Sequence, residues 1–208
     1  MKKICKVLIA IVIAAISFTS CSNDDVFDPQ QQLELEKPVI EAYVKRNYPN
    51  AQQLENSGIW YEIISQGEAN SFQYTVKDSL NQKFIFSEAV VNYTGKLVAD
   101  GTVFDKTDNV TTGDTLSVSM NLNTGQATVI QAWTLAFFPK TITVDTREIS
   151  LGALFDQGAQ RGSKFRIISP SGYGYGNMAQ GGIPANSPLD FEVEVLEMRP
   201  LRQRSTTN

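Results

Sequence analysis

Short runs of alternating apolar and polar residues, separated by turn-forming residues, fill the chain from Gly58 onward and restrict its fold most strongly. A period of two is typical of strands that bury one face, and closely spaced turns favour antiparallel pairing. We therefore predict a largely antiparallel sheet. The runs interpreted as strands are IWYEII, FQYTV, KFIFS, AVVNYTGKLV, LSVSM, TITV, KFRII and DFEVEVLEM.

The apolar period lengthens in TVIQAWTLAFF, which predicts one helix packed against this sheet. Pro139 ends this helix, because proline cannot continue the backbone hydrogen-bond ladder. The residues on its apolar stripe are Val129, Ile130, Trp133 and Phe137.

Two further helical segments are predicted. Residues 39–47 follow Pro38 and carry apolar side chains on one face, which indicates a short amphipathic helix. This helix either packs on the sheet or binds a partner, and packing is the simpler account. A second short segment covers residues 151–157, with Gly158 as its stop.

The first residues, MKKICKVLIAIVIAAISFTSC, have the pattern of a secretory leader. Its apolar run is shorter than the roughly 20 residues of a spanning helix. FTSC resembles a bacterial lipobox, which implies a lipid on Cys21. The alternatives are cleavage elsewhere with Cys21 unmodified, and an uncleaved leader that serves as the anchor. With the lipid, we expect the protein in the cell envelope, on a bacterial outer membrane and facing the periplasm or the surface.

Composition excludes several classes of site and partner. The chain has no His, and its two cysteines are Cys5 in the leader and Cys21. His-based metal sites, Ser-His-Asp triads and Cys-His dyads are therefore excluded, and we expect no metal and no cofactor. The net charge is −4, and loss of the leader removes three lysines and no acidic residue. Such an acidic exported protein is a poor binder of nucleic acid.

These features divide the chain into three parts. Residues 1–20 are the lipoprotein signal peptide, and residues 21–57 hold the lipidated Cys, an acidic linker and the short amphipathic helix. Residues 58–200 form a single domain. The acidic stretch after Cys21 resembles an export signal to the outer surface of Gram-negative cells, and a merely solvated linker is the alternative.

The segment VNYTGKLVADGTVFDKT contains a Tyr, two Gly and a Phe-Asp pair, although a hairpin needs only the residues of its turn. Asp100 and Gly101 are sufficient to form its turn. With VIQAW, RIISPSGYGYG, IPANSPLDFEVEVLEM and the strand SGIWYEIISQGE, it resembles the FKBP-type peptidyl-prolyl isomerases over residues 58–198. The resemblance implies an α+β fold, a twisted antiparallel sheet wrapped around one short helix. The chain is longer than this pattern near residues 68–88, where we expect an edge hairpin, and near 134–161, where we expect a flap or a lateral extension.

The resemblance also implies an apolar pocket that receives the proline ring of an X-Pro peptide. Phe104, Asp105 and Tyr175 are the catalytic candidates. Tyr175 is preferred to Tyr173 because Gly176 follows it directly, as in the family. The whole predicted lining is Tyr93, Phe104, Asp105, Val129, Ile130, Trp133, Tyr175, Ile183 and Phe191. For any one aromatic residue taken alone, core packing is the favoured account, and five at the family's spacing favour the pocket. The alternative for Asp105 is a surface turn residue.

The implied activity is rotation about X-Pro amides of exported polypeptides, which requires no acid, base or metal. Rapamycin-like macrolides are expected to bind the same pocket. Leu116 and Val118 stand where the family carries an aromatic residue, so one wall is less aromatic. Two other functions remain open: a peptide-binding or chaperone module without catalysis, and a structural envelope lipoprotein.

Overall fold

One long strand, β4 (Gln82–Leu97), forms the centre of the fold in the computed structural model, which describes residues 27–201. One edge of β4 pairs with β10 and β3, and the other edge pairs with β5 and β6. The main path of the sheet has the strand order β1-β2-β9-β10-β4-β3. All these pairs are antiparallel, as predicted. The other strands are β1 (Gln52–Gln53), β2 (Trp60–Gln66), β3 (Val76–Ser79), β5 (Val103–Lys106), β6 (Asp114–Asn121), β7 (Thr141–Val144), β8 (Arg147–Ser150), β9 (Ser163–Ser169) and β10 (Leu189–Pro200).

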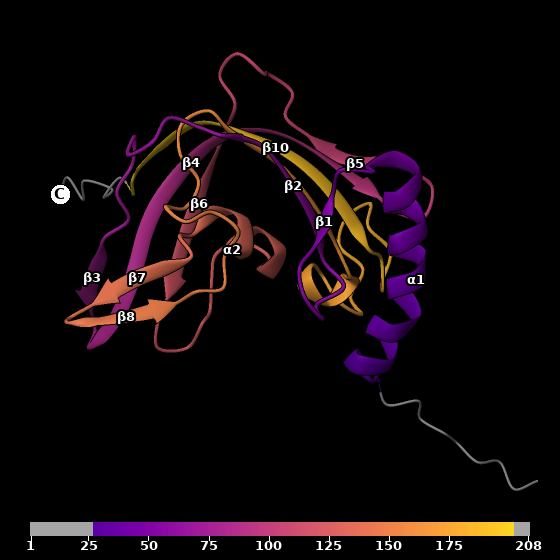
Figure 1. Ribbon diagram of the computed structural model, residues 1–208, viewed down its shortest axis with the longest axis horizontal. Coiled ribbons are helices and arrows are strands. Elements are labelled where there is room, and N and C mark those ends of the chain that lie inside the picture. The colour runs from indigo at the N-terminus through magenta and orange to yellow at the C-terminus, as the bar shows by residue number, and fades with distance from the viewer. Residues whose placement is uncertain (1–26, 202–208) are drawn as a thin grey trace, which may run out of the picture.

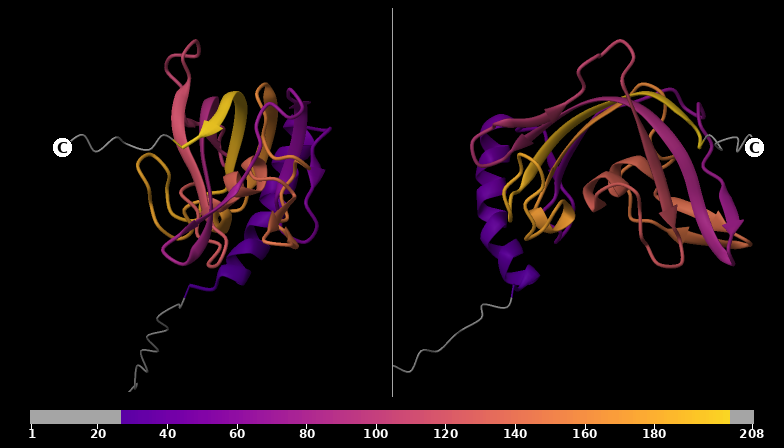
Figure 2. Two further views of the ribbon diagram at one scale, coloured as in Figure 1. Left: turned by 90° about the vertical axis from the view of Figure 1, so that its left-hand side faces the viewer. Right: turned by 180° about the vertical axis from the view of Figure 1, so that it is seen from behind.

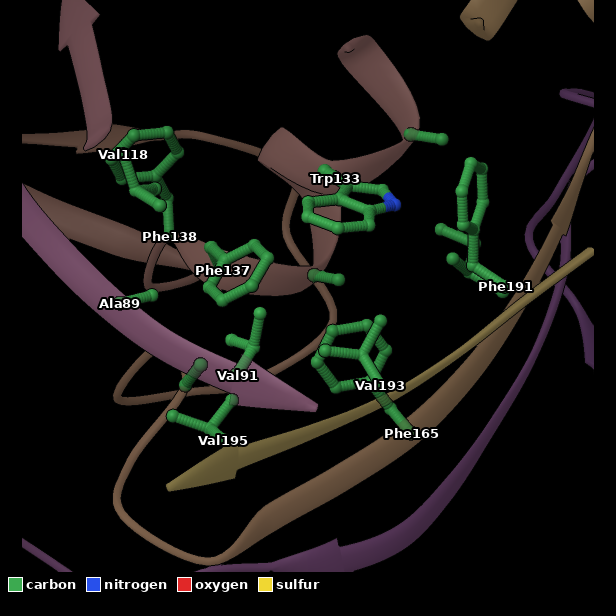
Figure 3. Packing of buried hydrophobic residues seen from close by; sticks show 14 of the residues in the cluster. Ala89, Val91, Val118, Trp133, Phe137, Phe138, Phe165, Phe191, Val193 and Val195 are labelled. Atoms are coloured by element: carbon green, nitrogen blue, oxygen red, sulfur yellow. The ribbon is translucent and has the colours of Figure 1, made fainter. Parts of the chain in front are cut away.

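The sheet arches over the short helix α2 (Gln131–Phe137), and the longer helix α1 (Pro29–Asn47) lies on its outer side (Figures 1 and 2). On the concave side, α2 buries Ala132, Trp133, Ala136 and Phe137 against apolar residues of β4, β9 and β10 (Figure 3). This arrangement confirms the predicted fold class, an antiparallel sheet wrapped around one short helix.

Helix α1 is longer than predicted, because it begins at Pro29 and not at residue 39. Asp28 caps it by accepting hydrogen bonds from the amides of Gln30 (2.9 Å) and Gln31 (3.3 Å), and proline is well suited to a first helical position. Pro38 lies inside the helix and does not end it. Part of the predicted linker is therefore helical, and residues 21–26 lie outside the described residues.

A second, smaller core holds α1 on the outer face of the sheet. Ile40 and Val44 are buried against Val98 and Ile168, whereas Val39, predicted on the same apolar face, is exposed. This packing supports the expectation that the helix lies on the domain's own sheet.

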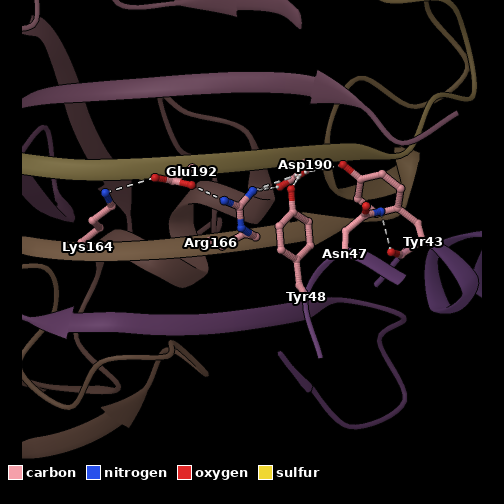
Figure 4. A network of polar contacts seen from close by, with 7 residues as sticks. All are labelled: Tyr43, Asn47, Tyr48, Lys164, Arg166, Asp190 and Glu192. Carbon is pink, nitrogen blue, oxygen red and sulfur yellow. Dashed lines mark hydrogen bonds and ion pairs between the residues drawn. The ribbon is translucent and has the colours of Figure 1, made fainter. Parts of the chain in front are cut away.

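Buried charges join the same helix to β9 and β10 (Figure 4). The fully buried Asp190 accepts hydrogen bonds from the hydroxyls of Tyr43 (2.8 Å) and Tyr48 (2.9 Å). Arg166 pairs with Asp190 at 3.0 Å and also with Glu192, and its guanidinium lies 3.8 Å from the centre of the Tyr48 ring. A buried carboxylate is tolerated here because it has a cation and two hydroxyl donors.

The two predicted extra segments lie beside each other. Residues 76–97 form the β3–β4 hairpin at the end of the sheet, and β7 and β8 form a separate two-stranded sheet next to it (Figure 1). Lys83 of β4 pairs with Asp145, in the turn between β7 and β8, at 2.8 Å. The 134–161 segment is therefore a lateral extension and not a flap.

Three local predictions were wrong. Residues 72–75 are not a strand, because the Tyr74 hydroxyl instead donates to the carbonyls of Phe137 (2.6 Å) and Ala159 (3.1 Å). KFIFS and AVVNYTGKLV belong to one strand, β4. Residues 151–157 are not helical, because their backbone pairs with Lys140 instead. The Leu151 amide donates to the Lys140 carbonyl, and the Lys140 amide donates to the Phe155 carbonyl.

Candidate active site

The β4–β5 hairpin brings three predicted site residues together, Tyr93 on β4 and Phe104 and Asp105 on β5. Its turn lies where the sequence predicted it. Gly101 has a φ of +77° and donates to the Leu97 carbonyl at 2.8 Å, and the Asp100 carboxylate accepts from the Thr102 amide at 2.8 Å. That hydrogen bond lowers the pKa of Asp100.

Gly95 has a different function from Gly101. A Cβ atom at position 95 would lie 2.6 Å from the Phe104 ring and 2.9 Å from the Phe191 ring. The absence of a side chain therefore lets these two rings meet over β4, where their centres are 5.6 Å apart. The clue to this role in the sequence is that the turn uses Gly101 and leaves Gly95 without a function there.

Trp133 lies at the centre of an aromatic cluster on the concave face (Figure 3). Its ring centre is 5.5 Å from that of Tyr93 and 5.3 Å from that of Phe191, both in edge-to-face geometry. Such contacts stabilise a pair by about 0.5–1.5 kcal/mol beyond the burial of area. Trp133 is only 6% exposed, and its Nε1 has no hydrogen-bond partner among residues 27–201.

Polar groups lie at the edge of this cluster. The Tyr93 hydroxyl donates to Oδ2 of the exposed Asp105 at 2.6 Å. Burial, and then this hydrogen bond, raise the pKa of Tyr93. Burial also raises the pKa of Tyr175, with a further contribution from the charge of Asp105. Asp105 thus contacts the Tyr93 hydroxyl directly, and its negative charge acts on the Tyr175 hydroxyl.

The start of α2 supplies a free backbone donor. Val129 and Ile130 precede the helix instead of lying within it, and both pack against the main core. The Ile130 carbonyl accepts from the amides of Trp133 (2.9 Å) and Thr134 (3.2 Å). The Ile130 amide makes no hydrogen bond within residues 27–201, as expected at a helix N-terminus.

The loop after β9 carries the remaining predicted residues. Ile183 is buried in the main core with Phe191, and Tyr175 packs against the same core. Tyr173 packs against this core too, ends a short 3₁₀-helix, η1 (Ser171–Tyr173), and lines a small cavity beside the first turns of α1. Eight of the nine predicted lining residues belong to or pack against the main hydrophobic core, which extends well beyond them, and the exposed Asp105 contacts it through Tyr93.

Glu36 of α1 fixes this loop, a contact that sequence analysis missed. Its buried carboxylate accepts from the amide (2.7 Å) and the hydroxyl (2.6 Å) of Ser171. The Ser171 carbonyl in turn accepts from the amides of Gly174 and Gly176, which flank Tyr175. The accessory helix therefore positions the loop that carries Tyr175. No local pattern could reveal a contact between residues 135 positions apart.

Leu116 and Val118, predicted to form the less aromatic wall of the pocket, lie on β6 and pair with Ala89 and Ser87 of β4. Val118 is fully buried, and Leu116 packs against the main core.

Within residues 27–201 no cluster of acidic or thiol side chains has the composition of a metal site. Over the same part of the chain no helix is long and apolar enough to cross a membrane.

Comparison with known proteins gives consistent matches. The family model described as FKBP-type peptidyl-prolyl cis-trans isomerase matches residues 86–196. FkpA of Escherichia coli, named as an isomerase of this type, is 28% identical over 145 residues, which are 70% of this chain and 39% of the relative. FK506-binding protein 4 of Saccharomyces cerevisiae is 31% identical over 109 residues, 52% of this chain and 21% of the relative.

The crystal structure of E. coli FkpA aligns with a TM-score of 0.45 and 26% identity, over 82% of this chain and 64% of the other. The chain spans well under half the length of the two curated relatives described above. The matched residues 86–196 contain every predicted lining residue and exclude α1.

Proposed function

Because the chain belongs to the FKBP-type peptidyl-prolyl cis-trans isomerase family, we propose that it catalyses rotation about X-Pro amide bonds at the Trp133 cluster. The observation that carries this proposal is the convergence of rings from the hairpin, α2 and β10 on Trp133. Beside them lies the Ile130 amide, which has no hydrogen-bond partner among residues 27–201. The ring cluster offers the apolar surface that a proline ring requires.

The reaction makes and breaks no covalent bond. Its barrier is about 18–20 kcal/mol, because the planar amide is stabilised by resonance. An apolar surface withdraws water from the planar, charge-separated amide, and a shape that fits the twisted amide lowers the barrier further. This chemistry requires neither imidazole nor thiolate, in agreement with a chain that has no His.

Three polar groups have assigned roles in this proposal. The Ile130 amide donates to a carbonyl of the peptide and fixes its direction. The Tyr175 hydroxyl donates to a second carbonyl. Asp105 holds the Tyr93 ring through the 2.6 Å hydrogen bond and lies where it can polarise the rotating amide.

A coupled isomerisation assay on the full chain tests the proposal, with peptides that differ in the residue before proline. We expect faster cis/trans exchange than in buffer for at least part of the series. Exchange at the buffer rate across the whole series would refute the catalytic assignment. It would then favour a peptide-binding module without catalysis, or a structural envelope protein.

A macrolide of the FK506 or rapamycin type should compete with the peptide, because both place an apolar ring on Trp133. Leu116 and Val118 give one wall without an aromatic ring, so we expect weaker binding than in a pocket with an aromatic residue there. Titration of the isomerase rate with the macrolide measures this. In a Trp60→Phe variant, a change in the fluorescence of Trp133 would indicate binding at the cluster, whereas inhibition without this change would indicate binding elsewhere.

We further propose that a lipid on Cys21 anchors the domain in the cell envelope, outside the inner membrane, where it acts on exported proline-containing polypeptides. The support is the leader pattern and FTSC, which lie outside the described residues. Cys21→Ala should move the protein from the membrane fraction to the soluble fraction, whereas Cys5→Ala should not. Full retention of the Cys21→Ala protein in membranes would instead indicate an uncleaved anchor.

A further inference from the structure

A groove of about 590 Å³ separates the β3–β4 hairpin from the β7–β8 hairpin. It shares no residue with the Trp133 cluster. Figures 1 and 2 show the two hairpins side by side at the end of the sheet away from α1. The Lys83 ammonium joins them by ion pairs to Asp78 and Asp145, each at 2.8 Å. The volume is within the usual range of about 300–1,000 Å³ for binding pockets.

The backbone of β3 is open toward this groove. Ser79 pairs with Gln82 across a two-residue turn, so these two residues exchange hydrogen bonds, and the pattern alternates from there along the hairpin. Val76 and Asp78, which both line the groove, therefore direct their backbone N–H and C=O groups away from β4. Lys83, the cross-strand partner of Asp78, follows the same alternation: its amide donates to Asn123 Oδ1 at 2.7 Å, away from β3.

Strand β7 has the same arrangement on the other side of the groove. Val144 pairs with Arg147 across a two-residue turn, so alternation directs the backbone groups of Thr141 and Thr143 away from β8. Both residues line the groove. Across residues 27–201, no strand pairs with the outer edge of β3 or β7. Over the same residues, no loop backbone forms a hydrogen bond with the outward groups of β3 and β7, those of Val76, Asp78, Thr141 and Thr143.

We propose that this groove binds an extended polypeptide segment as an added strand, with its backbone paired to β3, β7 or both, and that basic segments bind best. An extended chain is the ligand that supplies alternating donors and acceptors to open strand edges. Each edge is four residues long, about 13 Å at the rise of a strand.

The charge of the groove determines the preferred segment. Three carboxylates line it, those of Asp78, Asp145 and Asp156, against the single ammonium of Lys83. Asp78 and Asp145 share the ammonium of Lys83, and Asp156 pairs with Lys140 at 3.5 Å, so two cations face three carboxylates. All three carboxylates are exposed despite these pairs, so a basic side chain of a ligand can still reach them. Lysine or arginine side chains at the ends of the bound segment would complement this negative charge.

The binding site does not depend on the isomerase activity, and its test uses a ligand without proline. The probe is a fluorescein-labelled peptide of about ten residues, with alternating threonine and valine and a lysine near each end. Fluorescence anisotropy with the full chain should show saturable binding. The same peptide N-methylated at every second residue should bind at least tenfold more weakly, because it cannot pair along one edge.

Thr143→Pro removes one outward N–H donor of β7. Glu148→Pro is the matched control, because Glu148 pairs with Thr143 and its backbone groups point to the opposite edge of the same hairpin. We expect Thr143→Pro to weaken binding at least tenfold and Glu148→Pro less than twofold. Neither change should alter the isomerase rate on a short X-Pro peptide, so failure of this site and failure of the catalytic proposal are distinguishable.

Equal affinities of the two proline variants, full binding of the N-methylated peptide, or no binding by the unmodified protein would each overturn the proposal. If Thr143→Pro does not fold, Asp156→Lys replaces it. That variant should weaken binding of the lysine peptide severalfold and strengthen binding of a glutamate version. Unchanged affinities for both peptides would contradict the proposed site.

Discussion

Strands β9 and β10 bury charged side chains on only one of their two faces. Toward α2 they place Phe165, Ile167 and other apolar side chains, which pack without directional partners. Toward α1 they place Ile168 of the smaller core and also Arg166 and Asp190, whose burial depends on ion pairs and tyrosine hydroxyls. Apolar packing is lost gradually as atoms are removed, whereas a buried charge network fails when one partner is lost.

The two faces also differ in what they contribute to function. The concave face carries the proposed catalytic cluster, and the outer face holds α1. They meet at Ser171, where Glu36 of α1 fixes the loop that carries Tyr175. The accessory helix therefore contributes to the site without touching the Trp133 cluster. The following predictions test this difference in order of decreasing effect on stability.

The two tryptophans of the chain lie on opposite faces and give the largest contrast. Trp133 is buried beneath the concave face, so Trp133→Ala should lower the free energy of unfolding by about 3–5 kcal/mol. Trp60 is only half-buried against the α1 core, so Trp60→Ala should lower it by about half as much. Urea denaturation measures both. A larger loss for Trp60→Ala would mean that the outer face is the main source of stability.

Asp190→Asn tests the directional character of the outer face. The change keeps the size of the side chain but removes the charge that Arg166 and two hydroxyls contact, so we expect a loss of about 1.5–3 kcal/mol. Glu194→Gln is the control, since Glu194 is an exposed carboxylate two residues beyond Glu192 on the same face, and should change stability by less than about 0.5 kcal/mol. Equal effects would show that the network contributes no more than surface charge.

The same two faces explain which features could be predicted from the sequence. The concave face follows from the period of two in β9 and β10 and from the helical period before Pro139, which are local patterns. The aromatic set was found through the resemblance, and Phe104 and Phe191 do meet. The roles of the predicted site residues in catalysis stay predictions.

The missed features depend on contacts between distant residues. Helix α1 begins at Pro29, before Pro38, and its Glu36 carboxylate accepts hydrogen bonds from Ser171, far along the chain. Strand β8 was not predicted because all four of its residues are exposed, so it has no alternating pattern. The close approach of two rings at Gly95 had a clue in the sequence, since the turn accounts for only one of the two hairpin glycines.

Tyr43 gives a pH-dependent test of the outer face. Burial, and then the charge of Asp190, raise the pKa of its hydroxyl. The folded protein therefore keeps this proton at a pH where the unfolded chain loses it, near 10 and above. The hydroxyl should contribute about 1 kcal/mol below that pH, and this contribution should decline above it. Urea denaturation of Tyr43→Phe and the unmodified protein should thus differ at pH 8 and converge in the alkaline range. A constant difference up to pH 11 would contradict the burial of this hydroxyl.

Asp105 should have the smallest effect on stability and the clearest effect on activity. It is exposed, and its hydrogen bond with Tyr93 lies at the edge of the concave face, so Asp105→Val should change the free energy of unfolding by less than about 0.5 kcal/mol. We expect kcat/KM to fall about tenfold, the effect of losing roughly 1.4 kcal/mol of transition-state stabilisation. Asp108→Val, at an exposed carboxylate three residues further on, is the matched control and should change neither.

A double-mutant cycle with Tyr93→Phe assigns the effect of Asp105 to this hydrogen bond, because two changes that break the same bond are not additive. If Asp105→Val unfolds the domain as strongly as Trp133→Ala, the carboxylate is structural and the concave face also depends on a directional contact. If stability and rate are both unchanged, Asp105 is a surface residue of the hairpin. The proposed site would then consist of the Trp133 cluster, the Ile130 amide and Tyr175 alone.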